Sequence, residues 1–130
     1  MRKKNPKSDA LRLLKFRIRS EKELALRLKQ KGYSDEEVRE TIEELKNKGF
    51  IDDEKFAYLY AYDSLTLHKK GPFKIKMELI KLGVDEFIIE DAIKKVLNEV
   101  DLEEIKRELT EGLDAKKARE ILFRRGFGGE

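Results

Sequence analysis

The sequence has 130 residues, none of which is cysteine or tryptophan, and it contains a single histidine. Without cysteine the chain can form neither disulfide bonds nor thiolate metal sites. One histidine, His68, cannot supply a multi-histidine metal site, and a Cys–His nucleophile pair is impossible. His68 stands beside two lysines, and we expect it to lie exposed at a helix end. We therefore predict a protein that is not an enzyme and that needs no metal or cofactor.

Phosphate-binding loops are absent as well. None of the eight glycines stands in the GxxxxGK arrangement that cradles a nucleotide phosphate, so an ATPase is excluded. The acidic run Asp52-Asp53-Glu54 could in principle hold a divalent cation. Acidic side chains at the start of a helix are, however, what its unpaired N–H groups and its dipole attract. We interpret these three residues as helix caps.

Long hydrophobic runs are also missing. No apolar stretch approaches the roughly 18 residues that a membrane span needs, and no apolar region follows the basic start at residues 1–7 as in a signal peptide. We expect a soluble cytoplasmic protein. Charged residues make up 44% of the chain and only two prolines interrupt it, which is typical of helix-rich proteins. The abundance of lysine and glutamate, with one glutamine, favours a thermophilic source.

One pattern recurs along the chain. A glycine followed by an apolar residue occurs at Gly32, Gly83 and Gly126, at spacings of 51 and 43 residues. Apolar residues precede each glycine by four and by eight positions: Leu28, Leu79 and Leu122, and Leu24, Ile75 and Ala118. This spacing predicts a short helix with one core stripe, ending in a left-handed C-cap.

The starts and neighbours of these helices repeat too. Ser20 with Glu23 is read as a capping box, Gly71-Pro72 places proline in a first turn, and Asp114 can cap the third copy. A second capping box, Ser34 with Glu37, begins another helix whose apolar residues Val38, Ile42 and Leu45 reappear 51 residues later. Each copy also has a leading helix, with its apolar residues at Leu11, Leu14 and Ile18, then Phe56, Tyr60 and Leu67, then Leu102, Ile105, Leu109 and Leu113.

The predicted fold is therefore all-α, built from tandem three-helix repeats over residues 1–50, 51–100 and 101–130. The third repeat stops at Gly128-Gly129-Glu130, where its last helix should begin, so eight helices are expected. A single eight-helix globule without true repetition is the alternative, because short amphipathic helices resemble one another. The recurring glycines and caps favour repetition.

Charge alternates in step with the repeat. The formal charge is +9 for residues 1–33, −6 for 34–68, +4 for 69–83, −7 for 84–114 and +3 for 115–130. Middle helices are thus basic and third helices acidic. Like helices on one side of a repeat stack would form a basic lane and an acidic lane, and a polyanion would bind the basic one. The alternative is an ordinary surface solvated by charges of both signs.

The pair formed by a middle and a third helix also resembles a helix-turn-helix, which would place the third helix in the DNA major groove. Residues 35–48 hold six acidic and three basic side chains, and phosphates would repel them. Sequence-specific reading of an operator is therefore not expected.

Several residues are candidates for contacting a partner. At 100° per residue, Lys74 and Lys81 share one edge of their helix, and an offset of 43 carries them to Lys117 and Arg124. In the first repeat the positive charge concentrates instead on the leading helix and its end, at Arg12, Lys15, Arg17 and Arg19. We expect these basic residues, with Lys69 and Lys70, to face an anionic partner.

The aromatic residues of the second leading helix divide between two faces. Tyr60 follows Phe56 by four positions and is expected in the core, whereas Tyr58 and Tyr62 share another face. Exposed tyrosines near lysines would suit contact with bases or with a protein, and packing against a neighbouring repeat is the alternative.

Three stretches resemble the RecX family. The first is Arg19-Ser20-Glu21-Lys22-Glu23-Leu24 with Leu28 and Lys31-Gly32. The second, and the most distinctive, is Gly49-Phe50-Ile51-Asp52-Asp53-Glu54-Lys55-Phe56-Ala57, followed by Lys70-Gly71-Pro72, Ile75, Glu78-Leu79 and Leu82-Gly83. The third is Lys117-Ala118-Arg119, Leu122 and Arg124-Arg125-Gly126-Phe127. Together they cover nearly the whole chain, and we expect the shared motif residues to be structural.

The resemblance implies an elongated, curved molecule that lies in the groove of the filament formed by the recombinase RecA on DNA. It also implies a negative regulator that inhibits strand exchange, ATP hydrolysis and coprotease activity, acts in recombination, DNA repair and the SOS response, and binds single- and double-stranded DNA without sequence preference. A monomer is expected. A general single-stranded nucleic-acid-binding repeat module, or a helical adaptor for another protein, are the alternatives.

Overall fold

The computed structural model describes residues 5–128, which form eight α-helices and no strand. The predicted all-α class is confirmed. The helices are α1 (Pro6–Phe16), α2 (Glu21–Gln30), α3 (Asp35–Asn47), α4 (Asp53–Thr66), α5 (Pro72–Lys81), α6 (Glu86–Glu99), α7 (Leu102–Thr110) and α8 (Ala115–Arg124). The basic start at residues 1–4 and the two residues 129–130 of the predicted third repeat lie outside the described part of the chain.

The ends of α2, α5 and α8 share one geometry. The residue after each glycine donates its N–H to the carbonyl of the leucine five positions earlier, over 3.4 Å for Tyr33, 3.1 Å for Val84 and 2.8 Å for Phe127. The glycines themselves have φ of 98°, 84° and 93°. The left-handed C-cap predicted from the glycine pattern is thus present three times, and the apolar residue that follows is buried each time.

The predicted N-caps are also present, with one difference. The side chains of Ser34 and Glu37 form a complete capping box, and Asp114 accepts the N–H of Lys117 over 2.9 Å. Ser20 likewise accepts the N–H of Glu23. The Glu23 carboxylate, however, does not return to the cap, because it pairs with two arginines. Only half of the first predicted capping box exists.

The leading helices are shorter than predicted. α1 ends at Phe16, α4 at Thr66 and α7 at Thr110. Three residues predicted to extend their apolar stripes, Ile18, Leu67 and Leu113, therefore lie beyond the helices and are exposed. In α4 the core positions are taken instead by Ala61 and Leu65.

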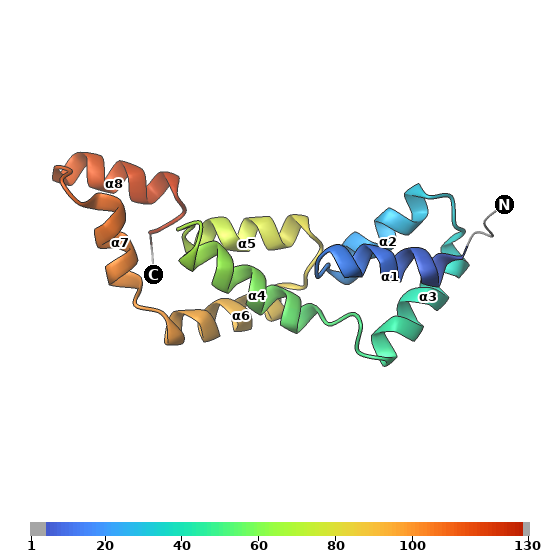
Figure 1. Cartoon of the computed structure of the whole chain (residues 1–130). Coiled ribbons are helices and arrows are strands. Elements are labelled where there is room, and N and C mark those ends of the chain that lie inside the picture. Colours follow the sequence, from blue (N-terminus) through green and yellow to red (C-terminus); the bar gives the residue numbers. More distant parts are fainter. Residues whose placement is uncertain (1–4, 129–130) are drawn as a thin grey trace.

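Two hydrophobic cores stabilise the molecule. One is formed by α1–α3 with Ile51, and it includes the fully buried Leu24, Leu28 and Leu45. The other is formed by α4–α6, joined by Ile105 of α7 and by Phe127 after α8. The two cores share no residue. The described chain is therefore a row of helical units and not one globule (Figure 1).

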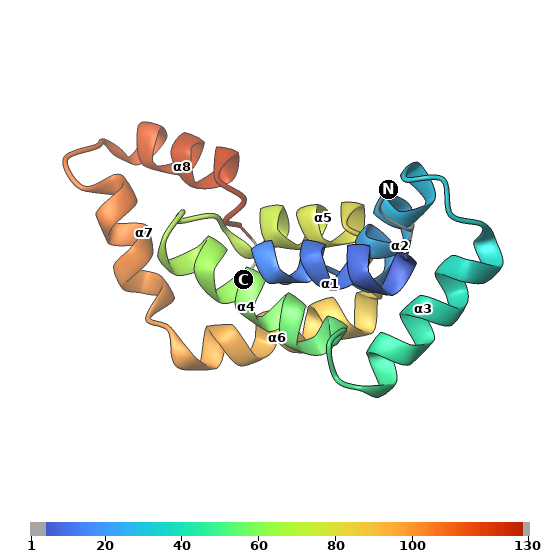
Figure 2. The same ribbon diagram turned by 45° about the vertical axis from the view of Figure 1, so that its right-hand side comes forward.

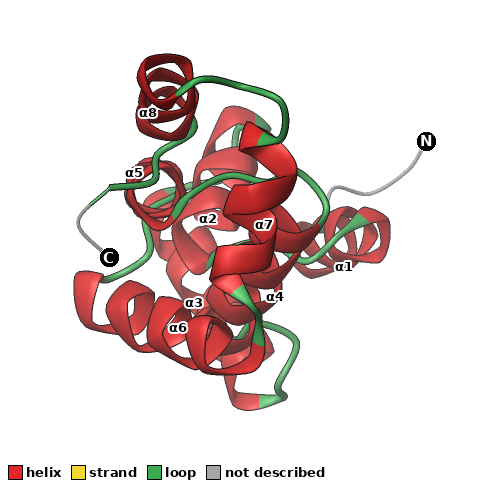
Figure 3. Ribbon diagram, turned by 90° about the vertical axis from the view of Figure 1, so that its left-hand side faces the viewer, coloured by secondary structure: helices red, strands yellow, loops and turns green. Residues whose placement is uncertain are grey.

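The middle helix of each unit lies on the same side of the molecule. In Figure 1, α8, α5 and α2 follow one another along the upper edge, whereas α3 and α6 lie along the lower edge, and the turned view of Figure 2 shows the same order. Seen along the long axis in Figure 3, α5 and α8 lie above α6. The arrangement creates the two lanes that the charge pattern predicts. Among residues 5–128, no helix is both long and apolar enough to span a membrane.

Candidate partner-binding surface

The three middle helices are joined end to end. The hydroxyl of Ser20, at the start of α2, donates to the carbonyl of Leu82 at the end of α5. At the equivalent place one repeat further on, the N–H of Gly71, which precedes α5, donates over 2.7 Å to the carbonyl of Arg125 at the end of α8. The N–H of Phe73 donates to Gly126 over 3.1 Å. Each N-terminal, electropositive helix end thus meets the electronegative end of the next helix.

Gly71 is required by the closeness of this junction. A Cβ atom built on it would lie 2.3 Å from the carbonyl carbon of Gly126 and 2.4 Å from the nitrogen of Phe127. These are backbone atoms that cannot move aside as a flexible side chain would. The family motif Gly71-Pro72 therefore serves a structural purpose, with the glycine allowing close approach and the proline beginning α5.

The four cations predicted to form one edge lie along this row. Lys74, Lys81, Lys117 and Arg124 are all exposed, and none has an ion-pair partner among residues 5–128. Lys74 and Arg124 line one groove between α5 and α8, so the structure brings these two together. Lys81 and Lys117 follow seven residues away on their helices, about 10 Å along each axis. The row of middle helices hence offers a line of unpaired positive charge.

An exposed apolar strip lies beside these cations, which the sequence analysis did not identify. On α5, Phe73, Met77 and Ile80 follow a helical spacing and are exposed, and on α8 Phe123 is 82% exposed. The groove between the two helices has a volume of about 500 Å³ and is lined mainly by apolar side chains. The signal was present in the sequence as a second i, i+4, i+7 pattern in α5, next to the core pattern of Ile75 and Leu79.

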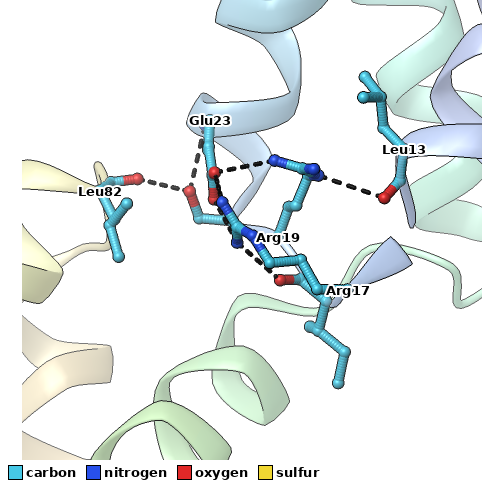
Figure 4. Close-up of polar contacts among 7 residues, drawn as sticks. Leu13, Arg17, Arg19, Glu23 and Leu82 are labelled. Carbon is cyan, nitrogen blue, oxygen red and sulfur yellow. Dashed lines mark hydrogen bonds and ion pairs between the residues drawn. The ribbon is translucent and has the colours of Figure 1, made fainter. Parts of the chain in front are cut away.

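Arg17 and Arg19, both predicted to face a partner, pair with Glu23 inside the molecule, and Arg17 stays exposed whereas Arg19 is buried. Figure 4 shows both side chains converging on Glu23, with Arg19 also donating to the carbonyl of Leu13 over 3.3 Å. Arg19 is only 8% exposed, and burial together with the charge of Arg17 lowers its pKa. These arginines fix the link between α1 and α2, and Arg19 in particular is inaccessible to a partner.

The remaining basic candidates differ in whether they form an ion pair within the molecule. Lys15 is exposed and has no ion-pair partner in the described chain, and Arg12 lies 3.7 Å from Asp9 on the same helix. Lys69 pairs with Glu108 of α7, and Lys70 pairs with Glu78 of α5 over 2.9 Å. The last two therefore connect helices and are not free to bind an anion without breaking an internal pair.

The tyrosines follow the predicted division into two faces. The Tyr60 ring lies 5.8 Å from that of Phe56, and the Tyr58 ring stacks on Tyr62 at 6.2 Å. The hydroxyl of Tyr58 donates to Glu99 of α6, which raises the pKa of this tyrosine. The Tyr58 hydroxyl is thus paired within its own unit, whereas Tyr62 is exposed.

The acidic run at the start of α4 acts as a pair of caps. Asp52 accepts the N–H of Lys55 over 3.1 Å, and Asp53 reaches across to accept the N–H of Glu21 over 2.8 Å, at the first turn of α2. Burial raises the pKa of Asp53.

Residues 5–128 contain no group of three or more metal-ligating side chains. His68 follows α4 and is exposed, as expected.

The other motif residues are structural. They fill the core or occupy turns with positive φ: Ile51, Phe56, Ala57 and Leu79 are buried, and Gly32, Gly49, Gly83 and Gly126 have left-handed backbones. The third helices α3 and α6 expose acidic side chains such as Glu36, Glu40, Glu43 and Glu86. Their charge opposes entry into a DNA groove.

Comparisons with known proteins agree with this architecture. Two models of the RecX family match the chain, that of the first three-helix domain over residues 7–45 and that of the second three-helix domain over residues 52–93. The regulatory protein RecX of Thermotoga maritima is 52% identical over 125 residues, which cover 95% of this chain and 78% of that relative. The Thermotoga petrophila protein of the same name is 50% identical over the same shares. The crystal structure of RecX from Lactobacillus salivarius superposes with a TM-score of 0.82 at 25% identity, covering 95% of this chain and 86% of that one.

Proposed function

The chain belongs to the RecX family of regulatory proteins, and from this premise we propose that it is a negative regulator that binds the RecA–DNA filament through its row of middle helices. Binding in the filament groove inhibits strand exchange, ATP hydrolysis and coprotease activity. The protein acts as a cytoplasmic monomer without catalytic activity of its own, in recombination, DNA repair and the SOS response. We also propose that the three repeats meet near residues 50 and 100. The protein is proposed to come from a thermophilic organism.

The line of four unpaired cations carries this proposal. Lys74, Lys81, Lys117 and Arg124 are exposed over two adjoining helices, and a nucleoprotein filament is an extended anionic partner. The extended form of the chain suits a long groove better than a small pocket. Charges spread along two helices, with about 10 Å of helix axis between the two on each, support contact with an extended surface and not with one small ligand.

DNA binding is expected to be weak and without sequence preference. The exposed cations contact phosphates, and the third helices α3 and α6, which a helix-turn-helix would place in the groove, expose acidic side chains. An affinity for duplex DNA that does not fall with rising salt, or a strong preference for one sequence, would contradict this expectation.

Charge reversal along the row tests the proposal. The variant carrying Lys74→Glu, Lys81→Glu, Lys117→Glu and Arg124→Glu should lose most of its inhibition of DNA-stimulated ATP hydrolysis by RecA. Its stability should change little, because exposed substitutions shift unfolding by no more than about 0.5 kcal/mol each. Circular dichroism verifies that the variant is folded.

The matched control changes the charge of the acidic third helices by an equal and opposite amount. Glu36, Glu40, Glu43 and Glu86 are exposed and have no ion-pair partner in the described chain. Their replacement by lysine should leave inhibition in place. If the folded row variant inhibits RecA as strongly as the parent, the proposed surface is wrong.

Two other functions make different predictions. A general single-stranded nucleic-acid-binding module would bind DNA equally well without RecA and would leave RecA turnover unchanged at substoichiometric ratios. A helical adaptor for another protein would affect neither. The alternating charge favours a partner with an extended surface, and the RecA assay separates the three.

A further inference from the structure

The exposed apolar strip on α5 is not explained by folding. Phe73, Met77 and Ile80 occur at positions i, i+4 and i+7, so they form one stripe on the helix surface. Phe73 is 64% exposed, and the other two are exposed as well. The core residues Ile75 and Leu79 of the same helix lie on the opposite side, roughly half a turn away. α5 thus has two apolar stripes, and only one of them packs inside the molecule.

Phe73 and Met77 of the second stripe line the groove between α5 and α8, and Ile80 lies further along α5. Phe123 stands on the α8 side, and Gly126 with the buried Phe127 lies between the two helices. Lys74 and Arg124 line the same groove. A ligand lying there would therefore meet apolar surface along its length and two unpaired cations close to it.

This combination favours a peptide over a nucleic acid. Bases bind proteins by stacking on aromatic rings within a positively charged groove. Phe73 and Phe123 contribute exposed rings to the groove, but Met77 in the same groove and Ile80 further along α5 provide no ring. The exposed Leu26 of α2, which stands 51 residues before Met77, is a further aliphatic side chain at the equivalent position of the first repeat. A helix or extended segment with apolar anchors and flanking carboxylates matches both the strip and the cations.

We propose that the α5–α8 groove binds an acidic segment of RecA that carries at least two large apolar side chains. The apolar anchors lie against Phe73, Met77 and Phe123, and the carboxylates pair with Lys74 and Arg124. This inference rests on the proposed function and specifies the chemistry of the partner surface at one place in the row.

Site-specific photo-crosslinking tests the partner directly. Phe123 is replaced by p-benzoylphenylalanine, the protein is mixed with RecA filaments on oligothymidine, and crosslinked peptides are identified by mass spectrometry after irradiation. The expected crosslink joins residue 123 to a RecA segment that is rich in Asp or Glu and contains large apolar residues. The control places the same group at Phe87, which is 84% exposed on α6 in the acidic lane. No crosslink to that segment is expected there.

A binding measurement complements the crosslink. The variant Met77→Gln with Phe123→Ser should bind RecA filaments roughly tenfold more weakly, as expected when central apolar anchors are removed. Its affinity for free oligothymidine should not change. Both residues are exposed, so the variant should fold.

Results of either experiment can overturn the inference. In the first, these are a crosslink to the DNA, to a second copy of this chain or to a neutral or basic RecA segment, or no crosslink at all. In the second, it is an unchanged affinity of the double variant for RecA filaments. If the parent protein inhibits RecA in the same experiments, only the groove proposal falls. If the parent itself neither binds nor inhibits RecA, the proposed function falls with it.

Discussion

Gly71 shows how a single missing side chain sets the distance between two helices. The substitution Gly71→Ala should destabilise the protein by about 1–3 kcal/mol, because the added carbon would overlap the backbone at Gly126 and Phe127. Urea unfolding measures the loss, and hydrogen exchange should show faster exchange at the N–H groups of Gly71 and Phe73.

Gly112→Ala is the suitable comparison for that variant. Gly112 has open space around it but a φ of 78°, so alanine there adds only the cost of a left-handed backbone. Gly71 is extended, and its whole penalty comes from crowding. A Gly71→Ala variant as stable as the parent would show that the helix ends are not in contact.

Glu78 provides a pH-dependent contribution to stability. Burial opposes its ionisation, but hydrogen bonds from Tyr60 and Lys70 outweigh burial and lower the pKa of Glu78 below its ordinary value of 4.5. Burial and the bond to Glu78 in turn raise the pKa of Tyr60 to about 12. A lowered carboxyl pKa stabilises the native state above pH 4.5, and this contribution disappears as the pH falls through the folded-state pKa.

We therefore expect Glu78→Gln to lower the free energy of unfolding by about 1 kcal/mol at pH 7 and by much less at pH 3. Urea unfolding at the two pH values measures both differences. Glu44→Gln is the control, since Glu44 pairs with lysines at an exposed site and should change stability less. An equal loss for Glu78→Gln at both pH values would contradict the assignment.

At the scale of the helix, Asp53 links the start of α4 to the start of α2. Asp53→Ala removes the acceptor for the N–H of Glu21 and should cost about 1 kcal/mol, as for other N-terminal caps. Asp53→Asn keeps an acceptor oxygen and should cost less.

Burial raises the pKa of Asp53, so its ionised form is disfavoured in the folded state. The stability of the parent relative to Asp53→Asn should therefore grow as the pH falls below the folded-state pKa. Thermal unfolding between pH 3 and 7 checks both statements, and equal losses for Ala and Asn would contradict the capping role.

The sequence predicts the ends of the helices correctly where a capping residue determines them. Ser34, Asp114 and the glycines at the ends of α2, α5 and α8 act within a few residues, so the sequence contains the whole interaction. The leading helices ended earlier than predicted because tertiary contacts decide there. Arg17 is extended and Arg19 turns back to Glu23, which leaves Ile18 outside α1. Pairing between distant segments is not visible in a hydrophobic pattern.

The candidate surface was predicted only in part for a similar reason. The edge of Lys74 and Lys81 follows from helix geometry alone, and both residues are exposed as expected. An apolar side chain, however, gives the same signal whether it is buried or exposed, so the strip of Phe73, Met77 and Ile80 was not recognised. The burial of Arg19 was missed because its partner Glu23 was assigned to the cap.

Across the whole molecule, the end-to-end contact of α2 and α5 joins two units that keep separate cores, whereas Ile105 and Phe127 of the third repeat pack into the second core. Polar groups dominate the boundary between the first two units: Ser20 bonds to Leu82, and Asp53 bonds to Glu21. The two buried clusters share no residue. In repeat proteins, stability is a sum of unit and interface contributions, so local damage should remain largely local.

Leu28 and Leu79 test this at equivalent positions, because each is fully buried four residues before its glycine, one in each core. Either leucine replaced by alanine should cost about 2–5 kcal/mol within its own core. Hydrogen exchange followed by mass spectrometry should then show faster exchange in α2 and α3 for Leu28→Ala, with α5 and α6 close to the parent, and the reverse for Leu79→Ala. If both variants accelerated exchange equally in all four helices, the molecule would unfold as one cooperative body. Because the four cations of the proposed surface lie on α5 and α8, which belong with the second core, Leu28→Ala should spare this surface whereas Leu79→Ala should disrupt it.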